Sequence, residues 1–199
     1  MKKTMAIGLG LLVGGIVSLA AADESRVMIV NAAGVDDTTL EAVRSHAERE
    51  LFVPVAAEKV AVTKGEDLKV IGKKLADKKT EQDACLVVLA NVMSETNVHS
   101  KIMTNEQVVV INVAALLSDD PVKFTRRLQR WVLRGAALLF GVGPDIDPHC
   151  VMHDYITLDE LDKMGLNFSP PWMDMFRDAA EKRGLTVRPF GVLPPGPVR

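Results

Sequence analysis

One short segment carries the residue types that could hold a metal ion. His149 and His153 stand four residues apart, and the thiol of Cys150 directly follows the first of them. Imidazole nitrogens and a thiolate are ligands that Zn²⁺ accepts, so this segment is the candidate for a metal site with hydrolytic chemistry. Three ligands in one loop, with no fourth, leave a tetrahedral site incomplete. We therefore favour a structural role for the segment, and a relocated metal site is the alternative.

Basic residues form a second cluster, on the helix that must position this segment. The helix is predicted to begin after Asp119 or Asp120, with Pro121 in its first turn, and to end at Gly141. At about 100° per residue, one face collects the cations Lys123, Arg126, Arg127, Arg130 and Arg134. A cationic stripe attracts anions, but charge runs on helices are usually solvated. We expect a solvated face, paired with the nearby acidic residues Asp145, Asp147, Asp159 and Asp162.

The end of this helix and the loop after it read RWVLRGAALLFGVGPDIDPHCVM over residues 130–152. This segment resembles the archaemetzincins, metalloproteases of the metzincin clan whose motif is His-Glu-x-x-His-x-x-Gly-x-x-His-Cys, followed by Cys-x-Met. In that motif the histidines bind Zn²⁺ and the glutamate is the general base. Aligning the family's Phe-Gly pair on Phe140 and Gly141 fills those four positions with Arg134, Gly135, Leu138 and Pro144. The resemblance therefore implies a degenerate member with no catalytic residues, no zinc cofactor and no peptidase activity.

Several scaffold residues of the family are present. The resemblance gives structural roles to Gly141, where the helix must end, and to Met152, at the family's Met-turn. Cys150 matches one cysteine of a second, four-cysteine zinc site, whose Cys-x-x-Cys is replaced here by SPPWM at 169–173. The segment that starts at Asn112 matches the strand leading into the helix. The implied fold is α/β, a mixed twisted sheet of about five strands with an antiparallel edge strand, a central former active-site helix and C-terminal helices.

Hydrophobic periodicity predicts the same order of elements without reference to the family. Strands are expected at 26–33, 52–62, 84–92, 98–104 and 108–116. Helices are expected at 40–51, 66–79, 121–140, 157–163 and 169–184, the first of them capped within 36–39. The hairpin around Asn105 and Glu106 places the 98–104 strand at an edge of the sheet. The domain is expected to span 23–184, followed by a Pro-rich tail at 185–199 that is either an extended strap or a disordered end.

The first 22 residues have the features of a secretory signal peptide. Lys2 and Lys3 precede an uncharged run, and small residues suit cleavage after Ala20 or Ala22. We therefore expect a periplasmic or secreted bacterial protein without stable membrane insertion after cleavage. The formal net charge of −2 becomes more negative when the leader is removed, so no nucleic-acid partner is expected.

The remaining cysteine and histidines have ordinary interpretations. Cys85 lies inside an apolar run and is predicted to be a buried thiol in a strand, although a disulfide with Cys150 is the alternative in an oxidising compartment. His46 and His99 stand alone and are interpreted as surface residues.

These observations favour an exported pseudopeptidase that binds an extended peptide or a strand of a partner protein. Metzincins align substrate along an edge strand, and main-chain pairing of that kind needs no metal. The predicted cleft consists of Lys101, Ile102, Met103 and Arg134, the last of which could anchor a carboxylate or fill space. Two alternatives stay open, a divergent metal-dependent hydrolase that uses His149, Cys150 and His153, and a structural periplasmic protein.

Overall fold

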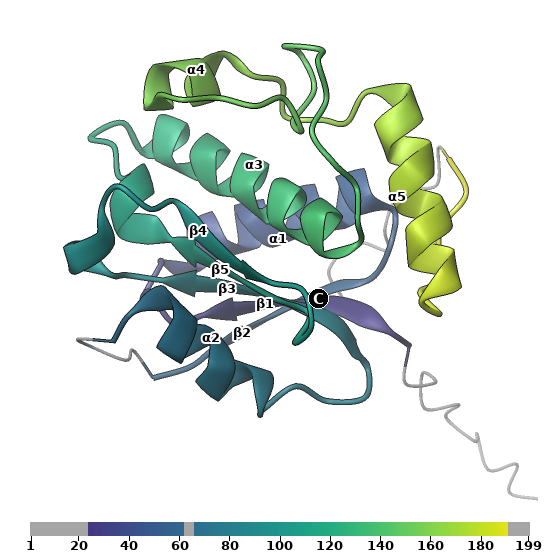
Figure 1. The fold of residues 1–199 in the computed structure, drawn as a ribbon, viewed down its shortest axis with the longest axis horizontal. Coiled ribbons are helices and arrows are strands. Elements are labelled where there is room, and N and C mark those ends of the chain that lie inside the picture. Colours follow the sequence, from purple (N-terminus) through teal and green to yellow (C-terminus); the bar gives the residue numbers. More distant parts are fainter. Residues whose placement is uncertain (1–23, 62–65, 191–199) are drawn as a thin grey trace, which may run out of the picture.

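A computed structural model describes residues 24–61 and 66–190 of the 199-residue chain. Within these residues five strands form one sheet in the order β2-β1-β3-β5-β4 (Figure 1). The strands are β1 (Arg26–Asn31), β2 (Val55–Lys59), β3 (Asp83–Ala90), β4 (Ser100–Met103) and β5 (Val108–Asn112). All neighbours pair in parallel except β4, which is antiparallel to β5 at the edge. The predicted mixed sheet with an antiparallel edge strand is confirmed.

Helices cover both faces of the sheet because its central strands are apolar on both sides. Val27 and Ile29 of β1 pack into one core with α1 and α3, and Met28 and Val30 pack into a second core with α2. Figure 1 shows α2 on one side of the sheet, with α1 and α3 on the other. The helices are α1 (Asp37–Leu51), α2 (Leu68–Ala76), α3 (Pro121–Leu139), α4 (Leu158–Lys163) and α5 (Pro170–Lys182).

The helix starts follow the capping signals in the sequence. The carboxylate of Asp36 accepts a hydrogen bond from the Thr39 amide at 2.9 Å and caps α1. The Asp120 carboxylate accepts from the Val122 amide at 2.8 Å and caps α3, with Pro121 in the first turn. Of the two predicted caps of α3, Asp119 and Asp120, the second is therefore the one observed, and Pro121 in the first turn is confirmed.

The last strand is shorter than predicted because a buried side chain ends it. The Asn112 side chain is fully buried and accepts hydrogen bonds from the amides of Val92 at 3.0 Å and Ala114 at 3.3 Å. These bonds turn the chain into a 3₁₀ helix, Val113–Leu116, instead of continuing the ladder. The segment that the family resemblance treats as a strand is therefore a strand end followed by a helical turn.

The C-terminal segment is an ordered strap as far as Phe190. Leu185 is buried, the Arg188 amide donates to the Phe52 carbonyl at 2.7 Å, and the Phe190 ring stacks on Phe52 with centroids 5.6 Å apart. Packing therefore continues past residue 184, where the domain was expected to end. The predicted signal peptide, 1–22, and the tail residues 191–199 lie outside the described residues. No helix within 24–61 and 66–190 is long and apolar enough to cross a membrane.

Candidate functional site

Helix α3 and the loop after it carry the four positions that the resemblance assigns to zinc ligands and base. Arg134 and Gly135 are buried, Leu138 is half-buried against the core, and Pro144 is exposed. None of these side chains offers a lone pair to Zn²⁺: they are a guanidinium cation, a hydrogen atom, an isobutyl group and a pyrrolidine ring, in that order. None of the four can take a proton from water at neutral pH. None of the four positions that the resemblance assigns to ligands and base therefore carries a side chain suited to that role.

Gly135 lets α3 approach the sheet more closely than a side chain would permit. A Cβ atom built on Gly135 would lie 2.8 Å from Cγ1 and 3.3 Å from Cγ2 of Val109 in β5. Both distances are shorter than normal packing contacts, so a larger residue would push the helix and strand apart. The position that the resemblance assigns to the general base therefore has no space for a side chain in this packing.

Arg134 forms hydrogen bonds with the loop that crosses over α3. Its Nη1 donates to the carbonyl oxygens of Val151 at 2.9 Å and His153 at 2.6 Å, and its Nη2 lies 3.4 Å from Oδ1 of Asp154. Only 6% of Arg134 is exposed, and this burial lowers its pKa below the usual value for arginine. Main-chain acceptors of the loop engage Nη1 of Arg134, and its Nε has no partner among the described residues, so of the two roles expected for Arg134 the structure favours filling space within the fold.

Two further arginines of α3 hold the same part of the chain. Arg127 makes a two-bond ion pair with Asp162, Nε to Oδ1 at 2.8 Å and Nη2 to Oδ2 at 2.7 Å. Arg130 donates to the carbonyls of Asp162, Met164 and Gly165. The expected solvated face is therefore wrong for these two residues and Arg134, which we call the arginine ladder, and only Asp162 is paired as expected. Lys123 and Arg126, nearer the start of α3, are exposed.

An aromatic cluster lies beside the ladder. The His99 ring stacks on Tyr155 with centroids 5.6 Å apart, and His99 Nδ1 is 2.7 Å from the Tyr155 hydroxyl. Trp131 meets both rings edge-on at 6.1 Å, and Cζ of Arg134 lies 5.7 Å from the Tyr155 ring centroid. Burial raises the pKa of Tyr155 and lowers that of His99. The interpretation of His99 as an isolated surface residue is wrong, and sequence reasoning missed Tyr155.

Hydrogen bonds link three residues at positions that the resemblance assigns to the second metal site. Asp145 stands where the motif places the cysteine after its third histidine, and its Oδ2 accepts from the Ser169 hydroxyl at 2.5 Å. The Cys150 Sγ accepts from the amides of Ser169 at 3.3 Å and Met152 at 3.4 Å. Asp145 and Cys150 are buried. Hydrogen bonds thus join the segments that the resemblance assigns to the second metal site.

The cysteines do not form a disulfide. Cys85 and Cys150 are both free and buried, and burial raises the pKa of Cys85, in strand β3, to about 12. The prediction of a buried strand thiol is confirmed, and the alternative of a disulfide is wrong.

The histidines of the loop do not gather with Cys150 into a ligand set. His149 is exposed, whereas Nδ1 of half-buried His153 faces the Asp145 carbonyl at 3.1 Å. Across the described parts of the chain, no three His, Cys, Asp or Glu side chains are arranged to hold a metal ion.

His46 also departs from its predicted surface position. It is 5% exposed on α1, its Nε2 lies 3.1 Å from the Leu166 carbonyl, and its Nδ1 lies 2.8 Å from Nη2 of Arg49. The carbonyl requires a donor and the guanidinium requires an acceptor, so the ring is neutral with its proton on Nε2. Burial is the main cause that lowers the pKa of His46 below 6.5.

The three residues of the predicted cleft that belong to β4 do not share one face of the sheet. Met103 is buried on the α2 face, where its Sδ would lie 2.6 Å from a Cβ placed on Gly72. Lys101 shares the α2 face by strand alternation, whereas Ile102 lies on the α3 face and is 38% exposed. Of the predicted cleft residues on β4, Ile102 is thus the one with a side chain on the same side of the sheet as α3.

The two scaffold residues predicted to be structural have the expected environments. Gly141 has φ +82°, in the left-handed region that favours glycine, directly after α3 ends. Met152 is fully buried in the core beneath the loop, and its carbonyl accepts from the Asp145 amide at 3.1 Å. Both environments are the ones expected for residues with a structural role, and the roles themselves stay predictions.

Comparison with known proteins gives the fold a name. The sequence matches no protein-family model and no curated protein. An archaemetzincin structure from Methanopyrus kandleri superposes with a TM-score of 0.64 at 18% identity, covering 82% of this chain and 99% of that one. A zinc-dependent peptidase from Methanocorpusculum labreanum gives 0.63 at 15% identity, covering 75% and 99%. An archaemetzincin from Archaeoglobus fulgidus, complexed with malonate, gives 0.59 at 11% identity, covering 75% and 99%. The chain therefore has an archaemetzincin-like fold.

Proposed function

We propose that this chain is an exported archaemetzincin-like protein that binds an extended peptide along β4 and does not hydrolyse it. The observation that carries the proposal is the position of β4 at the edge of the sheet, where one side of its backbone pairs with β5. An exposed edge is a template for an added strand.

The register identifies the backbone groups that face outward. The Asn112 amide donates to the His99 carbonyl at 2.8 Å, so this pair is hydrogen-bonded in the antiparallel ladder. Hydrogen-bonded and non-bonded pairs alternate, which makes Lys101 and Met103 face β5 and leaves the amides and carbonyls of Ser100 and Ile102 toward the open edge. Two outward residues supply two donors and two acceptors.

Four backbone bonds predict weak binding. At about 1 kcal/mol net for each bond, the edge alone supports a dissociation constant on the order of 1 mM. Side chains must supply the remaining affinity and the selectivity. Ile102 offers an apolar contact on the α3 face, and exposed Lys101 offers a positive charge on the other. The preferred peptide is therefore extended, apolar on one face and acidic on the other.

The proposal of no hydrolysis rests on the four motif positions. Arg134, Gly135, Leu138 and Pro144 provide neither a metal ligand nor a base, and Val109 leaves no space for a side chain at position 135. The edge strand β4 is nevertheless present. Loss of chemistry with retention of the edge supports a binding role over a divergent hydrolase.

The proposal of export rests on the leader sequence. Lys2 and Lys3, the uncharged run and the small residues before Asp23 direct secretion in this reading. Fusing residues 1–22 to a periplasmic reporter enzyme tests it directly. Reporter activity that stays in the cytoplasmic fraction would contradict export.

A proline substitution tests the edge. Ile102→Pro removes an outward donor without removing a ladder bond to β5, and Ile102→Thr is the matched control that keeps the amide. Peptides selected on an array by the wild-type protein should bind Ile102→Thr similarly and Ile102→Pro at least about tenfold more weakly. Circular dichroism confirms that both variants fold. Equal binding by the proline variant, or no peptide selected by wild type, would reject this function.

A further inference from the structure

A cavity lies away from β4, where α1 ends, α5 begins and the C-terminal strap passes. Its volume is about 490 Å³, within the size range of small-molecule sites. Its apolar lining comes from three separate segments and includes Phe52, Phe168, Met173 and Phe190. The Phe52 and Phe190 rings stack on each other, so the strap completes one wall. Phe190 is 82% exposed although it is aromatic, which is unusual for a purely structural contact.

The two arginines that line the cavity differ in their hydrogen-bond partners. Arg49 donates from Nε to Oε1 of Glu50 at 3.1 Å and from Nη2 to Nδ1 of His46 at 2.8 Å. By contrast, Arg177 lines the cavity and makes no hydrogen bond or ion pair within the described residues, although its Nε is itself shielded from solvent. A guanidinium at a cavity wall without a protein acceptor can pair with an anion that enters the cavity. Asp174, one turn earlier on α5, lines the same cavity.

We propose that this cavity binds a small apolar monocarboxylic acid. The carboxylate accepts hydrogen bonds from Arg177, and the hydrocarbon part lies against Phe52, Met173 and Phe190. A guanidinium suits a planar carboxylate because two parallel N–H groups match its two oxygens. Glu50 and Asp174 on the lining disfavour ligands with two or more negative charges, such as phosphates. The site does not depend on peptide binding at β4.

Titration of the full-length protein with 4-phenylbutyrate tests the proposal, followed by isotope-edited NMR of the methionine methyl groups and of the amides. Shifts are expected at Phe52 and Met173. The neutral amide 4-phenylbutyramide, which has the same hydrocarbon part, should bind at least about tenfold more weakly because it cannot form the charge-assisted pair.

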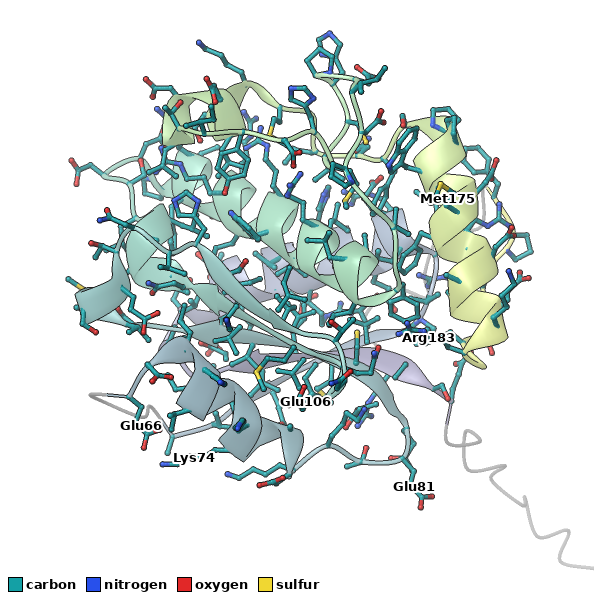
Figure 2. The ribbon with its side chains drawn as sticks, viewed as in Figure 1. Glu66, Lys74, Glu81, Glu106, Met175 and Arg183 are labelled. Atoms are coloured by element: carbon teal, nitrogen blue, oxygen red, sulfur yellow. The ribbon has the colours of Figure 1, made fainter. Side chains whose placement is uncertain are left out.

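Variants of the same helix separate the site from general effects. Arg177→Gln should weaken 4-phenylbutyrate binding about tenfold and leave the amide unchanged. Arg183→Gln is the matched control, since Arg183 lies at the far end of α5 from the cavity, with Cζ 4.5 Å from the Phe140 ring centroid (Figure 2). Phe190→Ala, at an exposed position that carries little folding energy, should also weaken binding. Equal affinity for acid and amide, unchanged binding by Arg177→Gln, or no measurable binding would overturn the proposal.

Discussion

Replacing Arg130 by methionine tests whether the arginine ladder holds the C-terminal half of the domain on α3. Arg130 is 4% exposed, and methionine keeps much of its length without its donors. The substitution removes hydrogen bonds to the carbonyls of Met164 at 2.7 and 3.1 Å, Asp162 at 3.1 Å and Gly165 at 3.2 Å. Three acceptors near the core then lose their donor.

The expected loss of stability follows from those acceptors. A buried polar group left without a partner costs about 1–3 kcal/mol, so the buried Met164 and the half-buried Asp162 and Gly165 together cost at most about 3 kcal/mol at the lower end of that range. Removing a desolvated cation offsets part of this cost, because burial already disfavours the charged form of Arg130 and lowers its pKa. The net prediction is a loss of about 2–3 kcal/mol in the free energy of unfolding, or about 4–12 °C in Tm for a domain of this size.

Urea and thermal unfolding followed by circular dichroism measure the effect, and hydrogen exchange at residues 160–168 measures its location. Arg126→Met is the matched control on the same helix, since Arg126 is exposed and its replacement should change stability by less than about 0.5 kcal/mol. Should Arg130→Met and Arg126→Met unfold alike, the ladder would not be a structural tether, and the reasoning from its hydrogen bonds would fail.

Three further outcomes are expected. Elemental analysis of the purified chain should find no stoichiometric zinc, and a zinc ion lost on mutating His149 or His153 would contradict this. The free energy of unfolding should fall as the pH drops below about 6.5. The pKa of His46 is lowered in the folded chain, so in this range the unfolded chain binds a proton at His46 that the folded chain does not. His46→Gln should flatten that pH dependence in urea titrations. Gly141→Val should lower Tm because a β-branched residue is strained at φ +82°, and Met152→Asp should lower it by burying a charge; unchanged melting in both would weaken the structural assignment.

Local signals in the sequence predicted the scaffold well. The caps could be predicted to within 36–39 for α1 and to Asp119 or Asp120 for α3, and Gly141 as a helix end, because each acts on backbone groups within three residues of itself. The edge position of β4 followed from a short hairpin, which brings sequence neighbours together. The strand around Cys85 could be predicted from the sequence because both of its faces are apolar.

The roles of the buried polar residues could not be predicted from the sequence, and the reason is physical. Arg130 and His46 are satisfied by carbonyls 34 and 120 residues away, and any residue type provides such a carbonyl. A helical wheel therefore shows a charged face and cannot show that another segment covers it. The closure of position 135 by Val109 is equally long-range, because it depends on how closely α3 approaches β5.

The arginine ladder also changes what the folded state depends on. A tether made through a metal ion is only as reliable as the local supply of that ion, and it is open to chelators and competing cations. Guanidinium groups are built into the polypeptide in fixed stoichiometry and lose their charge only far above physiological pH. Arg127, Arg130 and Arg134 thus hold residues 145–167 on α3 through groups that belong to the chain itself. This tether forms from the polypeptide alone as it folds.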